Sequence, residues 1–156
     1  MAYDSANQRF LVAWEDYRNG TDYNIFGQLL NADGSLFGGD FLISTAPNTQ
    51  LWPSVAYDSV NQRFFVIWED WRAGTNSDIY GQLVSATGDF IGGNFSISTA
   101  PNNQGWRPST TYDPVNQRYL VAWGDFRSGT TWDIYGQLVS ANGSLKDVKV
   151  LQSTGY

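Results

Sequence analysis

The sequence predicts an all-β protein built from three copies of one four-stranded unit, and three observations support this. A Tyr-Asp pair recurs at residues 3–4, 57–58 and 112–113, so the copies are spaced by 54 (57 − 3) and then 55 (112 − 57) residues. Each pair is followed by five consecutive apolar residues, as at 64–68, and no window has a useful helical period. Gly, Asn and Asp cluster between the apolar runs, which is typical of short strands joined by tight turns.

The second copy shows how each unit divides into strands. Turn formers separate its β-branched and aromatic runs, and Gly, Asn and Asp there permit the positive φ of tight hairpins. The expected strands are 53–58, 63–69, 78–85 and 95–98, with turn formers at 58–61, 73–76, 87–88, 92–93 and 100–103. The extra residue of the third copy is expected to be Arg107, beside Trp106. One repeat domain therefore spans 1–156, with its copies at approximately 2–46, 52–100 and 106–154.

The second strand of each copy predicts how the sheets are packed. Its residues 64–68, with their equivalents at 10–14 and 119–123, are apolar at five successive positions. Side chains alternate between the two faces of a strand, so both faces of this sheet must be buried. In a chain without helices, only other sheets can cover both faces, as happens when four-stranded blades surround an axis. The prediction is a β-propeller; the alternative is a β-trefoil monomer, whose barrel has one wetter face and fits these runs less well.

Three blades do not close a propeller ring, which takes about four to eight. Left uncovered, the outer faces of the first and third copies would expose more apolar area than monomeric proteins usually do. We therefore expect an obligate homodimer, in which two chains form a six-bladed ring.

Composition excludes several classes of function. The chain has 9 Lys+Arg and 15 Asp+Glu, hence a net charge of −6, and it contains neither Cys nor His. Thiol and imidazole chemistry, disulfides and the usual zinc sites are absent, and no cofactor is predicted. An acidic chain repels nucleic acids and anionic membranes, so neither is an expected partner. The N-terminal residues 1–4 lack the basic and apolar run of a signal peptide, so no leader is expected in this chain and its localisation stays open.

The repeat resembles the WD40-like propeller repeat of TolB-type proteins, and more closely the repeats of large, mostly uncharacterised secreted proteins of bacteria and archaea. The motifs that carry the resemblance in the third copy are Pro108-Ser109, Tyr112-Asp113-Pro114, Tyr119-Leu120-Val121-Ala122-Trp123, Asp125, Arg127, Gly129, Asp133-Ile134-Tyr135 and Ala141-Asn142-Gly143. The resemblance implies six blades and an extracytoplasmic binding or scaffold role, without an active site that can be transferred.

An acidic loop follows the second strand of each copy, at 14–18, 68–72 and 123–127. Its Asp and Arg either face a ligand or tie each loop to the neighbouring blade by charge-assisted hydrogen bonds, and the second interpretation suits residues present in every copy. Glu15 and Glu69 differ, because the third copy has Gly124 there. Adjacent carboxylates on a strand point to opposite faces and cannot flank one glycosidic bond, so no catalytic residues are predicted.

Aromatic residues in the loops at one end of the propeller are the predicted ligand-binding site. Indole and phenol rings beside carboxylates suit sugar rings or flat protein epitopes. The candidates are Trp52, Trp106, Arg107, Tyr17, Trp71, Trp132, Glu15 and Glu69, with Phe126, Tyr23 and Asp78 nearby. In the alternative interpretation, the first two of these tryptophans fill gaps between blades. No metal site is predicted, since Asp22 and Asp33-Gly34 lack the spaced acidic pattern of a calcium loop.

These observations predict a non-enzymatic binding or scaffold module whose ligand the sequence does not identify; a glycan or a protein is the candidate partner. The alternatives are a carbohydrate-binding lectin and, behind it, a glycoside-acting enzyme.

Overall fold

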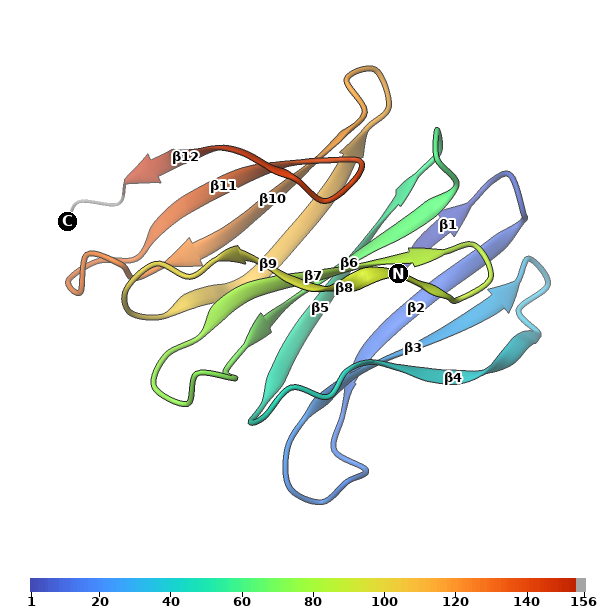
Figure 1. Ribbon diagram of the computed structural model, residues 1–156, viewed down its shortest axis with the longest axis horizontal. Coiled ribbons are helices and arrows are strands. Elements are labelled where there is room, and N and C mark those ends of the chain that lie inside the picture. The colour runs from blue at the N-terminus through green and yellow to red at the C-terminus, as the bar shows by residue number, and fades with distance from the viewer. Residues whose placement is uncertain (154–156) are drawn as a thin grey trace.

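Three four-stranded antiparallel sheets form the protein, as the computed structural model shows for the backbone of residues 1–153 and the side chains of 1–146. Each sheet contains four consecutive strands (Figure 1). The first blade consists of β1 (Ala2–Asp4), β2 (Arg9–Asp16), β3 (Asn24–Asn31) and β4 (Leu36–Ser44). The second consists of β5 (Gln50–Asp58), β6 (Arg63–Asp70), β7 (Asp78–Ser85) and β8 (Phe90–Ser98). The third consists of β9 (Gln104–Asp113), β10 (Arg118–Asp125), β11 (Asp133–Ser140) and β12 (Leu145–Ser153).

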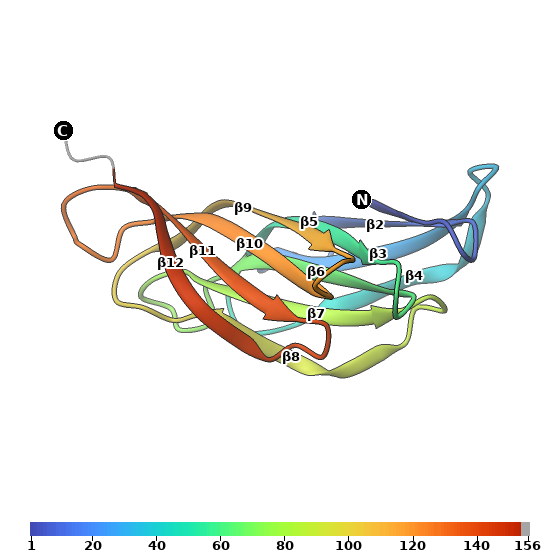
Figure 2. The same ribbon diagram turned by 90° about the horizontal axis from the view of Figure 1, so that it is seen from above.

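The sheets follow one another as propeller blades, with the second blade between the other two (Figures 1 and 2). The predicted all-β fold of three blades is therefore confirmed. The trefoil alternative is wrong, because each sheet pairs only strands of its own copy, whereas a trefoil joins its copies in one barrel. No helix among the described residues is long and apolar enough to cross a membrane.

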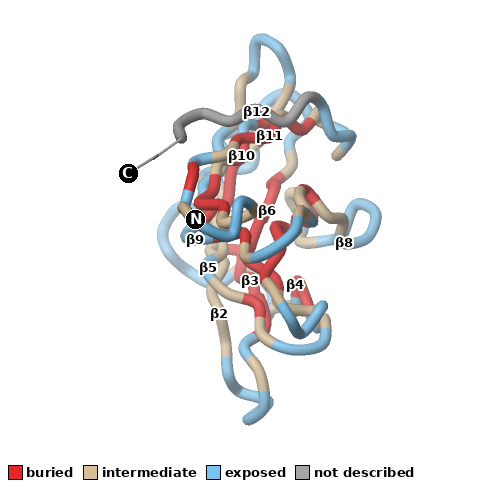
Figure 3. Tube along the Cα trace, turned by 90° about the vertical axis from the view of Figure 1, so that its left-hand side faces the viewer, coloured by how far each residue is buried: buried red, intermediate tan, exposed pale blue. Residues whose placement is uncertain are grey.

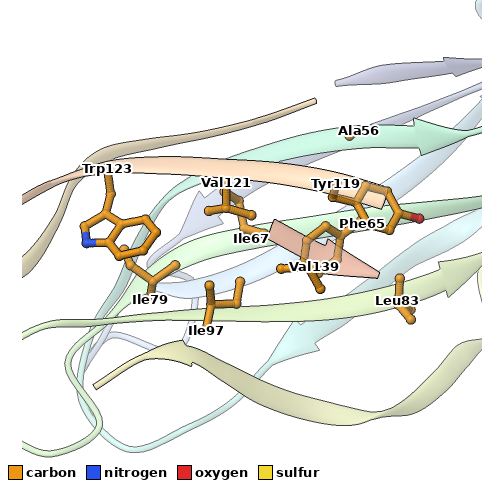
Figure 4. Packing of buried hydrophobic residues seen from close by; sticks show 10 residues of the cluster. All are labelled: Ala56, Phe65, Ile67, Ile79, Leu83, Ile97, Tyr119, Val121, Trp123 and Val139. Atoms are coloured by element: carbon orange, nitrogen blue, oxygen red, sulfur yellow. The ribbon is translucent and has the colours of Figure 1, made fainter. Parts of the chain in front are cut away.

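The second blade is buried on both faces, as its five-residue apolar run predicted. Residues 64–68 of β6 are all fully buried. Phe64, Val66 and Trp68 pack with Leu11 and Ile25 of the first blade, a contact that we call the first seam. Strand alternation sends Phe65 and Ile67 the other way, into a cluster with the third blade, which we call the second seam. The two seams form the hydrophobic core, whose buried residues lie along the middle of the fold (Figure 3), and Figure 4 shows the second seam.

The outer strand of the second blade is longer than the sequence predicted. It begins at Phe90 instead of residue 95, because Gly92 and Gly93 lie within β8 and not in a turn. The register of β8 against β7 shifts there, which is a β-bulge, and Gly92 has the positive φ of 72° that such a kink requires. The Gln82 amide donates to the carbonyl groups of Ile91 and Gly92 and so supports the bulge.

The repeated Asp-Arg pair stabilises its own loop. The sequence had predicted that it would tie each loop to the neighbouring blade, and that prediction was wrong. In the second blade, Asp70 accepts hydrogen bonds from the Trp68 indole at 2.7 Å and from Arg72 Nε and Nη2 at 2.9 and 2.7 Å. The Arg72 guanidinium also lies 3.7 Å from the centre of the Tyr80 ring. A polar contact between blades comes instead from Tyr57, whose hydroxyl donates to Asp4 of the first blade at 2.5 Å.

Candidate functional site

Two adjoining pockets open at the end of the fold where the β6–β7 loop meets the connections between blades. Their volumes are about 330 and 420 Å³, and both are lined by Trp52, Glu69 and Trp71. Trp106 and Trp132 complete the wall of the smaller pocket. We call the two pockets together the aromatic groove. It lies across the loop end of the second seam and extends toward the first.

A glycine inserted in the third copy explains why the groove opens at the loop end of the second seam. Gln50 pairs with Asp70 and Gln104 with the equivalent Asp125, but the next paired residues are Leu51 in one copy and Trp106 in the other. Gly105 is therefore the extra residue, and the prediction of Arg107 was wrong. Gly105 has a φ of 117°, and a Cβ placed on it would lie 2.7 Å from Glu69 Cγ. Only glycine permits this backbone to pass so close to Glu69.

The Glu69 carboxylate forms the floor of the groove and has one oxygen without a well-formed hydrogen bond. Its Oε1 accepts a hydrogen bond from the Trp71 indole at 2.8 Å. Its Oε2 is buried and accepts no well-formed hydrogen bond among the described residues. The Ser77 hydroxyl lies close enough to lower the pKa of Glu69, but it donates its proton to the Gln104 carbonyl oxygen at 2.6 Å. Burial raises the pKa of Glu69, whose residue is only 5% exposed.

Glu15 occupies the equivalent position in the first blade, where its role is structural. Its Oε2 accepts a hydrogen bond from the backbone N–H of Trp52 at 2.9 Å, which closes the loop end of the first seam. In the third blade the equivalent residue is Gly124, and a Cβ there would lie 3.0 Å from Trp106 Cβ. The space of the missing side chain is therefore filled by Trp106, whose ring centre lies 5.7 Å from that of Trp132.

The structure brings five of the eight predicted ligand-binding residues together in the groove. These are Trp52, Trp71, Trp106, Trp132 and Glu69. The other three lie outside it: Arg107 is exposed, Tyr17 packs against Tyr23 in the first blade, and Glu15 makes the backbone contact described above.

The exposure of the tryptophans decides between the two interpretations of these rings. Trp106 is 59% and Trp52 is 38% exposed, so neither residue is buried as a plug between blades. Phe126 lies beside the groove, where its ring centre is 5.2 Å from that of Trp132.

Asp78 is buried away from the groove, although the sequence placed it near the candidate site. It pairs with Asp70 across β6 and β7, on the face that carries Trp68 toward the first blade. Burial, followed by repulsion from Asp70, raises the pKa of Asp78 to about 6.

Sequence reasoning missed several residues of the groove. Ser77 and Asn103 line its smaller pocket, and Gly105 lets the chain approach Glu69. The larger pocket is also lined by residues that had not been predicted for the site: Asp22, Asn48, Thr49, Leu51 and Gly74. Asn103 had been counted only as a turn residue. The insertion itself was visible in the sequence as the change from a 54- to a 55-residue spacing, but its position was not. Among the described residues, no group of three or more acidic side chains is arranged to hold a metal ion.

Comparison with known proteins supports the fold. No family model matches the chain and no curated protein matches its sequence, so the resemblance to the TolB-type repeat stays a prediction. Among solved structures, the chain is similar to the endo-arabinase of Bacteroides thetaiotaomicron VPI-5482, with a TM-score of 0.61 and 12% sequence identity. The match covers 94% of this chain and 59% of the endo-arabinase. At this identity the likeness establishes a common β-propeller-like architecture.

Proposed function

We propose that this protein is a non-enzymatic binding module whose aromatic groove binds a saccharide. The observation that carries the proposal is a groove walled by four indole rings, with the Glu69 carboxylate among the lining residues of both of its pockets.

The indole walls of the groove suit the apolar face of a sugar ring. Four tryptophans line it, and the rings of Trp106 and Trp132 are tilted by 57° to one another. An indole ring offers a large, rigid apolar surface on which the C–H face of a sugar can rest. The Asn103 side chain, also in the lining, supplies an amide for a second hydroxyl. The groove thus combines apolar area with a few oriented polar groups.

A glycan array followed by a fluorescence titration tests this proposal. The indoles in the groove should report binding of the strongest saccharide through a change in tryptophan emission. We expect Trp106→Ala and Glu69→Gln each to weaken binding about tenfold, which corresponds to about 1.4 kcal/mol. The matched control is Tyr17→Ala, an exposed aromatic residue outside the groove, which should bind as the unmodified protein does. Absence of any bound saccharide, or full binding by both groove variants, would contradict the proposal.

A second candidate is a glycoside-acting enzyme, favoured by one observation in the larger pocket. Asp22 and Glu69 both line it, and a carboxyl group with a raised pKa beside a second carboxylate is the combination that glycoside hydrolysis uses. The named structural neighbour, an endo-arabinase, acts on glycosides. Incubation with linear arabinan and measurement of new reducing ends distinguishes the candidates: release that is lost in both Asp22→Asn and Glu69→Gln supports the enzyme, and no release supports the binding module.

A further inference from the structure

The two end blades each present an uncovered apolar face that the second blade does not have. On the third blade this face carries Leu120 and Ile134, which are 38% and 39% exposed. Their equivalents in the second blade, Phe65 and Ile79, are fully buried in the second seam. From Tyr119 to Trp123 of β10, buried residues alternate with more exposed ones, as expected when only one face of the sheet is covered.

The uncovered face of the first blade carries the complementary set. Phe10, Val12 and Trp14 are only half-buried there. Their equivalents in the third blade are Tyr119, Val121 and Trp123, which the second blade covers almost completely (Figure 4). Each end of the chain's series of blades therefore carries one half of a contact whose complete form is seen within the molecule.

A cluster of polar and aromatic side chains on the first blade is partly exposed, whereas its equivalents in the other two blades are covered. Trp14 donates its indole N–H to Asp16 at 2.9 Å and is stacked with Phe26, over which the Arg18 guanidinium lies at 4.0 Å. The indole–aspartate bond and the guanidinium over an aromatic ring recur in the other two blades, where the aspartate side chain is fully buried. Asp16 keeps 15% of its side-chain surface exposed.

We infer that the uncovered faces are occupied by a second copy of this chain, with the third blade of each copy packed on the first blade of the other. The second seam is the template for each of the two new contacts. Propeller rings contain about four to eight blades, and six is the one multiple of three in that range. Two copies therefore close the ring with twofold symmetry and leave no further face exposed.

The size of the contact suits a stable dimer. Each new seam joins two four-stranded sheets face to face, on the order of 1,000 Å² of surface, so two seams together reach the range of permanent interfaces. The contact is made by the faces of the sheets, and Trp106 and Trp132 of the groove lie beside Gly124 at the loop end of the third blade's uncovered face.

Light scattering on the purified chain at micromolar concentration tests the inference directly. The expected mass is 34.8 kDa, twice the 17.4 kDa of one chain. Leu120→Glu places a charge in the proposed contact. Because Leu120 is exposed in the single chain, the variant should remain folded, with a mass of 17.4 kDa. The matched control is Val115→Glu, on a turn residue that is 87% exposed, which should leave the dimer intact. A folded unmodified chain at 17.4 kDa, a larger open assembly, or a dimeric Leu120→Glu variant would overturn the inference.

Mixing two variants tests the head-to-tail arrangement. Val12→Glu blocks the face of the first blade as Leu120→Glu blocks that of the third, so each alone should be monomeric. Mixed together, the unblocked face of one variant meets the unblocked face of the other, and a species of 34.8 kDa should return. If like faces met like faces instead, only one of the two variants would lose its dimer, and mixing would restore nothing.

Discussion

Glu15 and Glu69 occupy equivalent positions in consecutive copies, yet they do different things. Glu15 accepts a hydrogen bond from the Trp52 backbone and closes the first seam. Glu69 is denied the corresponding bond because Gly105 enlarges the next connection and passes against its side chain. The freed carboxylate becomes the floor of a groove. One added residue, which costs the sheet only a local register shift, has thus turned a structural contact into a candidate binding site.

The largest effect that we expect is on the free energy of unfolding when a buried ring is removed from either seam, and the loss should be similar in the two seams. Phe64→Ala removes a fully buried ring from the first seam and Phe65→Ala removes one from the second. Each should lower the free energy of unfolding by about 3–5 kcal/mol, as cavity-forming substitutions of buried phenylalanine do. Urea denaturation at one fixed protein concentration measures both, with the exposed Val115→Ala as the control. A difference of several kcal/mol between the two phenylalanine variants would show that the seams differ in their cores as well as in their loops.

An intermediate effect should appear in the pH dependence of stability, because the first blade has Asn24 where the second has Asp78. The pKa of Asp78 is raised to about 6 in the folded protein, against about 4 in an unfolded chain. Its contribution to stability is therefore fully present below about pH 4 and is lost as the pH rises through 6. Asp78→Asn removes this loss.

The measurement compares the unfolding free energies of the two proteins at pH 4 and pH 7. Relative to the unmodified protein, Asp78→Asn should gain roughly 2–3 kcal/mol across that interval. An equal pH dependence in both proteins would mean that Asp78 is not protonated on folding.

The smallest effect is also the sharpest test of the comparison, because one substitution should act with opposite signs in the two copies. Glu15→Gln weakens the hydrogen bond to the Trp52 backbone and should lower stability at pH 7 by about 0.5–1.5 kcal/mol. Glu69→Gln removes a charge that burial disfavours, as its raised pKa indicates, and should raise stability at the same pH. Thermal denaturation of both variants gives the signs directly. Destabilisation by both would mean that the two glutamates play the same structural role.

Much of the fold could be predicted from local patterns. The five apolar residues at 64–68 required burial on both faces of a strand, and the tertiary structure provides it. The turn assignment at Gly92-Gly93 was wrong, because glycine supplies positive φ equally well to a turn and to a bulge. The Asp-Arg pairs were assigned to the wrong partner, since the sequence does not reveal whether such a bond stays within a loop or crosses to the next blade.

The sequence predicted which types of residue form the candidate site, but not which individual residues line it. Four tryptophans and one glutamate of the predicted set meet in the groove, whereas Arg107, Tyr17 and Glu15 do not line it. Equivalent positions in a repeat look the same in the sequence, so Glu15 and Glu69 could not be told apart there. The spacing change identified the unusual copy, but only the strand register identified Gly105 as its cause.

The sequence by itself determined the blade: its strand order, its two-sided apolar strand and the number of copies, because alternation and turn chemistry act over a few residues at a time. Tertiary structure decided what those copies do when they meet. Glu15 keeps its backbone partner and Glu69 does not, because an inserted residue, Gly105, lies against Glu69 between two blades. Glu69 and Gly105 are about 36 residues apart in the chain, so local sequence patterns do not predict their contact.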